Sequence, residues 1–166
     1  MDFVYLALGS NLGDSHQIIR TALGKLQAFS DEPLLQSSLW ETEPVDCPPN
    51  SPPFVNAVVA LKPRADETPE SLLAKLQALE KEFGRRPKQV LNEPRPLDLD
   101  LVAFGREMRT SAGLVLPHPR GHLRRFVLEP LSEICAEFTL PLQRESVSAL
   151  LRKLPQGEHP TRIASA

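Results

Sequence analysis

The sequence predicts a mixed α+β fold, a ferredoxin-like βαββαβ sandwich in which both long helices cover one face of an antiparallel sheet. Strand-like and helix-like segments follow one another in that order, without internal repeats. The 166 residues, 41% of them hydrophobic, suffice for one domain with a sizeable core. The placement of the 17 prolines marks the loops. We therefore expect a single domain over residues 1–154, which ends in a helical extension.

The first half of the chain supplies strand, helix, strand and strand. The run FVYLAL (3–8) is apolar and rich in strand-forming residues. A capping-box pattern at Asp14 starts a helix over about 15–28. The next two strands are expected in LLQSSLWETE (34–43) and FVNAVVALK (54–62), and the loop between them holds five prolines in ten residues.

The second half of the chain supplies helix, strand and extension. Pro69 is typical of a first helical position, and leucines at helical spacing continue to residue 83, before Gly84 ends the helix. A long polar loop precedes an acidic strand over 97–103. The remaining expected elements are a short return strand, two helices and a loose tail, over 113–117, 125–137, 145–154 and 155–166.

Charge and composition exclude several function classes. The net charge of −2 provides no global field for a nucleic-acid or membrane partner. Cys47 and Cys135 have no metal-ligand spacing between them, which favours a reducing compartment. No signal peptide or transmembrane span is visible, so we expect a soluble, cytoplasmic protein.

The acidic strand carries the first candidate site. Asp98 and Asp100 alternate with leucines, so in a strand the two carboxylates share one face and the leucines the other. The Cβ atoms of the two aspartates would lie about 7 Å apart. Such neighbours repel each other unless a cation lies between them. A lone pair of this kind is more often a solvated strand face, so its surroundings decide its meaning.

Two basic segments flank the acidic strand. The preceding loop contains Arg85, Arg86, Lys88 and Arg95, and the segment HPRGHLRRF (118–126) adds further cations. Carboxylates hold Mg²⁺ together with substrate phosphates, and arginines bind the remaining phosphate oxygens. Either basic cluster alone would be a solvated surface; together with the carboxylates they suit a metal–polyphosphate complex. No Walker-type P-loop is present.

Four motifs in order resemble a known family: ALGSNLGD, FVNAVVAL, PRPLDLDLVAFG and LPHPRGHLRRFVLEPL. They are similar in spacing to the 6-hydroxymethyl-7,8-dihydropterin pyrophosphokinases over about residues 3–135, and PRPLDLDL is the most specific of them. The resemblance implies a ferredoxin-like sandwich. It also implies transfer of the β,γ-diphosphate of ATP to the pterin hydroxymethyl group, with release of AMP, in folate biosynthesis.

The resemblance implies catalytic roles at the ATP end. Asp98 and Asp100 match the carboxylates that hold two Mg²⁺ ions around the triphosphate of the co-substrate ATP. Arg85 and Arg95 match arginines of a mobile loop that bind and activate the phosphates. The other implied ATP contacts are Gln77, Glu80, Leu101, His118 and Arg124.

At the pterin end, the resemblance implies that two aromatic rings stack on the pterin and that an amide hydrogen-bonds to its edge. Phe54 and Phe126 match the two rings that stack on the pterin, and Asn56 matches the amide. Without the joint pattern, both phenylalanines would be assigned to the core. The pterin-binding set also includes Asp98 and the backbone of Thr42 and Val45.

The sequence departs from the family at several positions. Phe54 stands where several relatives have Tyr, so stacking is kept and a hydroxyl is lost. Secondary ATP contacts of some relatives are absent at Pro87, Asn92, Gly113, Val115 and Pro119. No general base is evident; metal-assisted deprotonation, with or without Asp100, stays open at this point.

Other function classes stay open at this point. A ferredoxin-like module that senses a small ligand would need neither Mg²⁺ nor turnover, and a paralogue with an altered substrate would share the motifs. A two-metal nucleic-acid enzyme expects a broad basic stripe, against which the net charge of −2 argues. The long loops 44–53 and 84–96 are expected to act as lids. The oligomeric state does not follow from these patterns.

Overall fold

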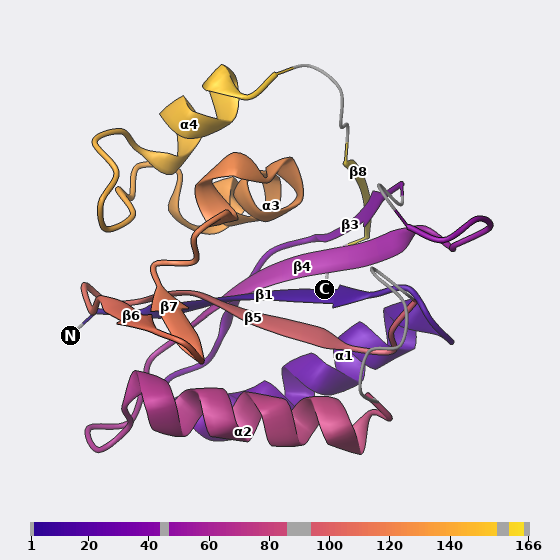
Figure 1. Cartoon of the computed structure of the whole chain (residues 1–166), viewed down its shortest axis with the longest axis horizontal. Helices are drawn as coiled ribbons and strands as arrows, with labels where there is room; N and C mark the ends of the chain where they lie inside the picture. The colour runs from indigo at the N-terminus through magenta and orange to yellow at the C-terminus, as the bar shows by residue number, and fades with distance from the viewer. Residues whose placement is uncertain (1, 44–46, 86–93, 156–159, 165–166) are drawn as a thin grey trace.

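The computed structural model describes residues 2–43, 47–85, 94–155 and 160–164 (Figure 1). Its strands are β1 (Val4–Ser10), β2 (Leu35–Gln36), β3 (Leu39–Thr42), β4 (Phe54–Leu61), β5 (Asp98–Phe104), β6 (Arg109–Ser111), β7 (Leu114–Leu116) and β8 (Thr161–Ala164). Its helices are α1 (Ser15–Leu26), α2 (Pro69–Glu82), α3 (Arg125–Cys135) and α4 (Val147–Lys153), with short 3₁₀ turns η1 (Gln27–Phe29) and η2 (Gly121–Leu123). No described helix is both long and apolar enough to cross a membrane.

One antiparallel sheet forms the centre of the molecule. Its strand order is β5-β1-β4-β3-β8, and β2 pairs with β4 beside this path. The central strand β1 pairs with β4 on one side and with β5 on the other. The prediction of an α+β fold with an antiparallel sheet is confirmed. The strand predicted over 34–43 is instead two strands, because the Val58 N–H donates to the Ser37 hydroxyl at 2.9 Å and so interrupts the backbone ladder.

Helices cover both faces of the sheet (Figure 1). The long helices α1 and α2 pack together on one face, as predicted, over a core that includes Leu6, Leu8 and Leu99. On the opposite face, α3 and α4 pack over Val58 and Val102. This second face is therefore covered in part by helices, because the apolar side of α3 also needs burial.

The C-terminal segment completes the sheet. In place of the loose tail predicted over 155–166, Thr161–Ala164 form β8 along β3, with Arg162 opposite Trp40. The guanidinium of Arg162 also lies 3.9 Å from the carboxylate of Glu133 on α3. Strand β8 covers a backbone edge of β3 that would otherwise expose unpaired hydrogen-bonding groups.

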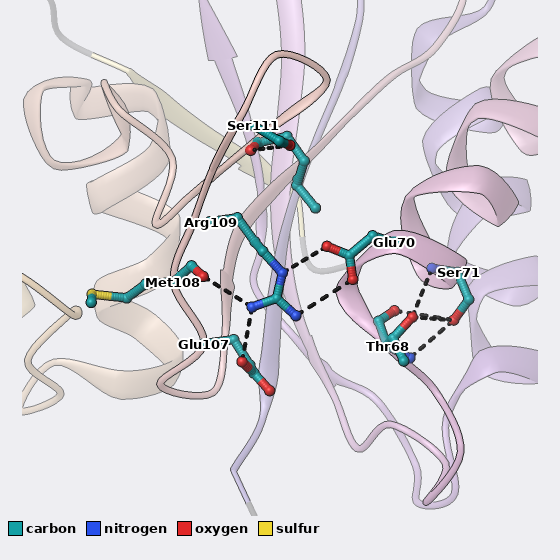
Figure 2. A network of polar contacts seen from close by, with 8 residues as sticks. Thr68, Glu70, Ser71, Glu107, Met108, Arg109 and Ser111 are labelled. Atoms are coloured by element: carbon teal, nitrogen blue, oxygen red, sulfur yellow. Dashed lines mark hydrogen bonds and ion pairs between the residues drawn. The ribbon is translucent and has the colours of Figure 1, made fainter.

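A polar network holds the β6–β7 hairpin beside α2 (Figure 2). Arg109 Nε donates to Glu70 at 2.7 Å, and its Nη1 donates to Glu107 at 3.0 Å. Glu70 lies in the first turn of α2, which begins with a capping box between Thr68 and Ser71. Because these ion pairs are exposed, we expect them to orient the hairpin and to contribute little to stability. The hairpin leads directly into the basic segment of the candidate site.

Candidate active site

The acidic pair lies on β5 as the alternation predicted. Leu97, Leu99 and Leu101 are at most 6% exposed and belong to the core under α1 and α2. Asp98 and Asp100 therefore project from the opposite face, the one on which Val102 contacts the α3 layer. They lie at one end of this face, and neither belongs to the apolar cluster under α3 and α4.

Two arginines neutralise Asp98. Arg85 Nη1 donates to Asp98 Oδ1 at 2.7 Å, and Arg95 Nη1 lies 3.5 Å from Asp98 Oδ2. Arg85 also donates to the Leu97 carbonyl at 3.2 Å. Both predicted phosphate-binding arginines thus lie at the predicted metal-binding carboxylate.

Asp100, like Asp98, is partly buried. Burial, followed by repulsion from Asp98, raises the pKa of Asp100 to about 7, although the charge of Arg124 opposes this shift. Burial and the neighbouring carboxylate both favour the protonated form of Asp100, and a cation bound beside it would favour the charged form. The site around Asp100 is therefore electrostatically suited to gain a cation.

Glu80 joins the end of α2 to the acidic strand. Its Oε2 accepts the Leu99 N–H at 2.8 Å and a hydrogen bond from Arg85 Nη1 at 3.1 Å. Burial raises the pKa of Glu80, opposed by these two partners. Gln77, one turn earlier, is exposed and ready to contact solvent or a ligand. The helix thus brings one buried and one exposed predicted ATP contact to the same end of the sheet.

The second basic segment reaches the outer edge of β5. The His118 N–H donates to the Val102 carbonyl at 2.9 Å, and His118 Nδ1 accepts the Arg120 N–H at 3.1 Å. Burial, followed by the charge of Arg124, lowers the pKa of His118. The side chain of Leu101 is buried in the core, so this residue is able to contact ATP only through its backbone.

A row of four residues crosses the sheet beside the acidic pair. Asp98 lies opposite Gly9, Gly9 opposite Asn56, and Asn56 opposite Trp40. Residues directly opposite in an antiparallel pair share a face. Gly9 has no side chain, so the Asn56 amide oxygen and the Phe54 ring approach its backbone closely.

Of the predicted pterin-binding residues, Asp98 and Asn56 belong to this row, and Thr42 and Phe54 lie opposite each other next to it on β3 and β4. Asn56 is 5% exposed, and its Nδ2 donates to Thr42 Oγ1 at 2.8 Å. The Arg95 guanidinium carbon lies 5.8 Å from the centre of the Phe54 ring, and that of Arg124 lies 5.4 Å from the Phe126 ring. The amide is thus fixed by a hydroxyl, and each ring is next to an arginine of the predicted ATP end.

Some predicted positions lie outside the described residues, namely Val45, Arg86, Pro87, Lys88 and Asn92. The expected lid movements of loops 44–53 and 84–96 depend on these segments. Among the departures, Val115 is 42% exposed on β7, and Gly113 and Pro119 are exposed as well.

Sequence reasoning missed two residues of this site. The motif ALGSN contributes to the family resemblance, and the structure adds that Asn56 and Phe54 approach Gly9 closely and that Asn11 is 1% exposed. Neither residue type has a chemical signature that indicates its neighbours. The one available signal was positional: Gly9 and Asn11 stand at the end of the first predicted strand.

The donor atoms fit magnesium that arrives with a polyphosphate. The described residues contain no group of three or more His, Cys, Asp or Glu side chains arranged to hold a metal ion. Mg²⁺ is commonly held by one or two carboxylates together with substrate phosphates and waters. Asp98 and Asp100 supply two such carboxylates from one face of β5.

Comparisons with known proteins agree with this chemistry. The profile of the 7,8-dihydro-6-hydroxymethylpterin-pyrophosphokinase (HPPK) family matches residues 5–136. A 2-amino-4-hydroxy-6-hydroxymethyldihydropteridine pyrophosphokinase of Porphyromonas gingivalis is 42% identical over 138 residues, which cover 81% of this chain and 91% of that protein. A protein of the same name from Bacillus subtilis is 37% identical over 149 residues, covering 89% and 84% respectively.

Longer proteins match as well. The folic acid synthesis protein fol1 of Pneumocystis carinii is 38% identical over 151 residues, and the match spans 20% of its length. The solved structure of Plasmodium falciparum HPPK-DHPS with pteroate has a TM-score of 0.72 at 15% identity, and the match covers 91% of this chain and 42% of that one. At this identity the likeness shows the fold alone.

Proposed function

The chain belongs to the 7,8-dihydro-6-hydroxymethylpterin-pyrophosphokinase family, and on that premise we propose that the sheet face around Asp98 is its active site. The family activity is an ATP-dependent diphosphotransfer in folate biosynthesis. The hydroxymethyl oxygen of 6-hydroxymethyl-7,8-dihydropterin attacks the β-phosphorus of ATP. The bond from that phosphorus to the α,β-bridging oxygen breaks, and AMP leaves with this oxygen.

One observation carries the site assignment. Carboxylates, arginines, a buried amide and an aromatic ring meet at one end of one sheet face, although they come from distant parts of the sequence. The residues are Asp98, Asp100, Arg85, Arg95, Arg124, Asn56 and Phe54.

The ATP end consists of the carboxylates and the arginines. We assign Asp98 and Asp100 as the ligands of Mg²⁺ bound with ATP, expected as two ions; such ions neutralise the phosphates and favour in-line displacement. Arg85 and Arg95 now pair with Asp98 and become available for phosphate oxygens when ATP and metal bind. Their guanidinium groups stabilise charge that develops on the transferred group.

The pterin end consists of the amide and the aromatic rings. Thr42 Oγ1 accepts one N–H of Asn56, which leaves the rest of the amide for the edge of a heterocycle. Phe54 and Phe126 supply flat apolar faces for stacking. Phe54 lies beneath Arg95, so the pterin and the phosphates would meet at this arginine.

We also propose the ferredoxin-like description of the fold. The order β5-β1-β4-β3 supports it, since the first and last strands of the βαββαβ unit lie side by side. Strand β8 extends this unit by one strand beyond β3.

The direct test is incubation of the protein with ATP, Mg²⁺ and 6-hydroxymethyl-7,8-dihydropterin, with AMP and the pterin diphosphate measured. We expect AMP and the diphosphate in equal amounts, and none of either when the pterin is omitted. Release of ADP, or AMP without the pterin product, would refute the diphosphotransfer. A ligand sensor would bind both compounds without forming AMP, and family membership does not favour that alternative.

A further inference from the structure

Asn11 connects three chain segments that are far apart in the sequence. Its side chain is 1% exposed, in the turn between β1 and α1. The Asn11 N–H donates to the Arg95 carbonyl at 3.1 Å, and the Arg95 N–H donates to Asn11 Oδ1 at 2.9 Å. Asn11 Nδ2 donates to the Pro52 carbonyl at 3.3 Å. One buried side chain therefore satisfies backbone groups of two loops.

Both of these loops supply residues to the proposed active site. Arg95 directs its guanidinium to Asp98 at 3.5 Å and over the Phe54 ring at 5.8 Å. Pro52 lies two residues before Phe54, at the entrance to β4. Asn11 thus fixes the backbone of the arginine and the backbone that leads to the ring beneath it.

One hydrogen-bond donor of the Arg95 guanidinium has no partner among the described residues. This donor is Nε, which is buried. A buried N–H without a partner costs free energy until a ligand accepts from it. The Arg95 side chain is therefore pre-organised to donate to a ligand. It keeps this position only if the backbone of Arg95 is fixed as well.

We propose that Asn11 is a positioning residue that acts through Arg95, by clamping its backbone between the ATP end and the pterin end of the site. This inference rests on the proposed function. An amide suits the position because it accepts from one loop and donates to the other. Alanine would leave the Arg95 N–H and the Pro52 carbonyl buried without these partners, so both segments would shift.

A double-mutant cycle on the full chain tests the proposal. We expect Asn11→Ala to lower kcat by about 10- to 100-fold, with a smaller change in KM for ATP, because a small misplacement of a catalytic group costs rates of this order. Added to Arg95→Ala, the same change should lower kcat little further. Multiplicative losses in the double variant would overturn the proposal. Asn11→Leu, which has a side chain of similar size and removes both side-chain hydrogen bonds, replaces the alanine variant if the latter does not fold, and the same outcomes are expected of it.

Ser30→Ala is the matched control. Ser30 is also buried, and its Oγ accepts a backbone N–H from a distant residue, Lys62, at 3.0 Å, at the other end of β4. We expect this variant to lose thermal stability and to keep kcat. An equal loss of kcat in Ser30→Ala would assign the Asn11 effect to general destabilisation and overturn the proposal.

Hydrogen exchange separates this inference from the proposed function. The Arg95 amide should exchange faster in Asn11→Ala than in the wild type, and unchanged protection would overturn the clamp whatever the activity. Unchanged kcat in Arg95→Ala would refute the catalytic role of Arg95 in the proposed function, and with it the action of Asn11 through that residue. Faster exchange without any effect of Arg95→Ala would leave Asn11 a structural residue only.

Discussion

Gly9→Ala places one methyl group at the centre of the proposed pterin site. A Cβ at this position would lie 3.3 Å from Asn56 Oδ1 and 3.7 Å from Phe54 Cδ1. Asp98, its other neighbour in the row, has no atom within 4 Å of that Cβ. The substitution therefore perturbs the amide and the ring while it leaves the carboxylate in place.

The expected magnitude follows from how tightly Asn56 is held. The amide is buried, and Thr42 Oγ1 accepts from it at 2.8 Å, so a shift of a few tenths of an ångström away from the methyl disturbs this hydrogen bond. A hydrogen bond to the pterin that is lost in a buried site costs about 1–3 kcal/mol. Affinity for the pterin should then fall by about 5- to 150-fold, with ATP affinity changed by less than about twofold.

Calorimetric titration of each ligand measures this difference directly. Gly24→Ala is the matched control, because Gly24 is an exposed residue of α1 and a Cβ there meets nothing within 4 Å. This control should bind both ligands normally and gain up to about 1 kcal/mol of stability from its helix propensity. Unchanged pterin affinity in Gly9→Ala would refute the placement of the pterin over the row, and equal losses for both ligands would refute its selectivity.

The remaining predictions concern the charged and polar groups of the site. Asp98→Ala or Asp100→Ala should lower AMP formation by orders of magnitude while circular dichroism stays native, since charge stabilisation is usually the largest catalytic contribution; near-normal turnover in both would exclude the metal site. Asn56→Ala should weaken pterin binding far more than ATP binding in calorimetry, because its buried amide faces the row; equal losses would contradict this role. Arg85→Ala should bind Mg²⁺ more tightly without ATP, because Arg85 no longer neutralises Asp98, yet turn over more slowly; metal titration and AMP assays measure the two effects, and a weaker Mg²⁺ affinity would contradict the first. Burial lowers the pKa of His118 from 6.5, so the stability that neutral His118 provides is present above this pH and is lost as the pH falls through its folded pKa. Thermal melts of His118→Gln should therefore show less acid destabilisation than those of the wild type. Parallel melting curves of the two proteins against pH would contradict this.

The sequence was sufficient for local structure. Strand and helix periodicity, the cap at Asp14 and the proline that begins α2 agree with the elements found, within a few residues at each end. The alternation of Leu97, Leu99 and Leu101 with the two aspartates was also sufficient to determine which face the carboxylates share, because strand side chains alternate regardless of the neighbouring strands. The family resemblance supplied the rest of the chemistry.

Contacts between distant segments required the tertiary structure. Strand β8 was predicted as a loose tail because its pairing with β3 depends on a partner over a hundred residues away. The covering of the second sheet face by α3 and α4, the counter-charges on Asp98 and the roles of Gly9 and Asn11 have the same origin. The sequence by itself determined which residue types carry the chemistry and how each strand presents them. Only the tertiary structure decided which of them meet, because strand register and loop contacts arise from burial and hydrogen bonding between segments that local patterns do not connect.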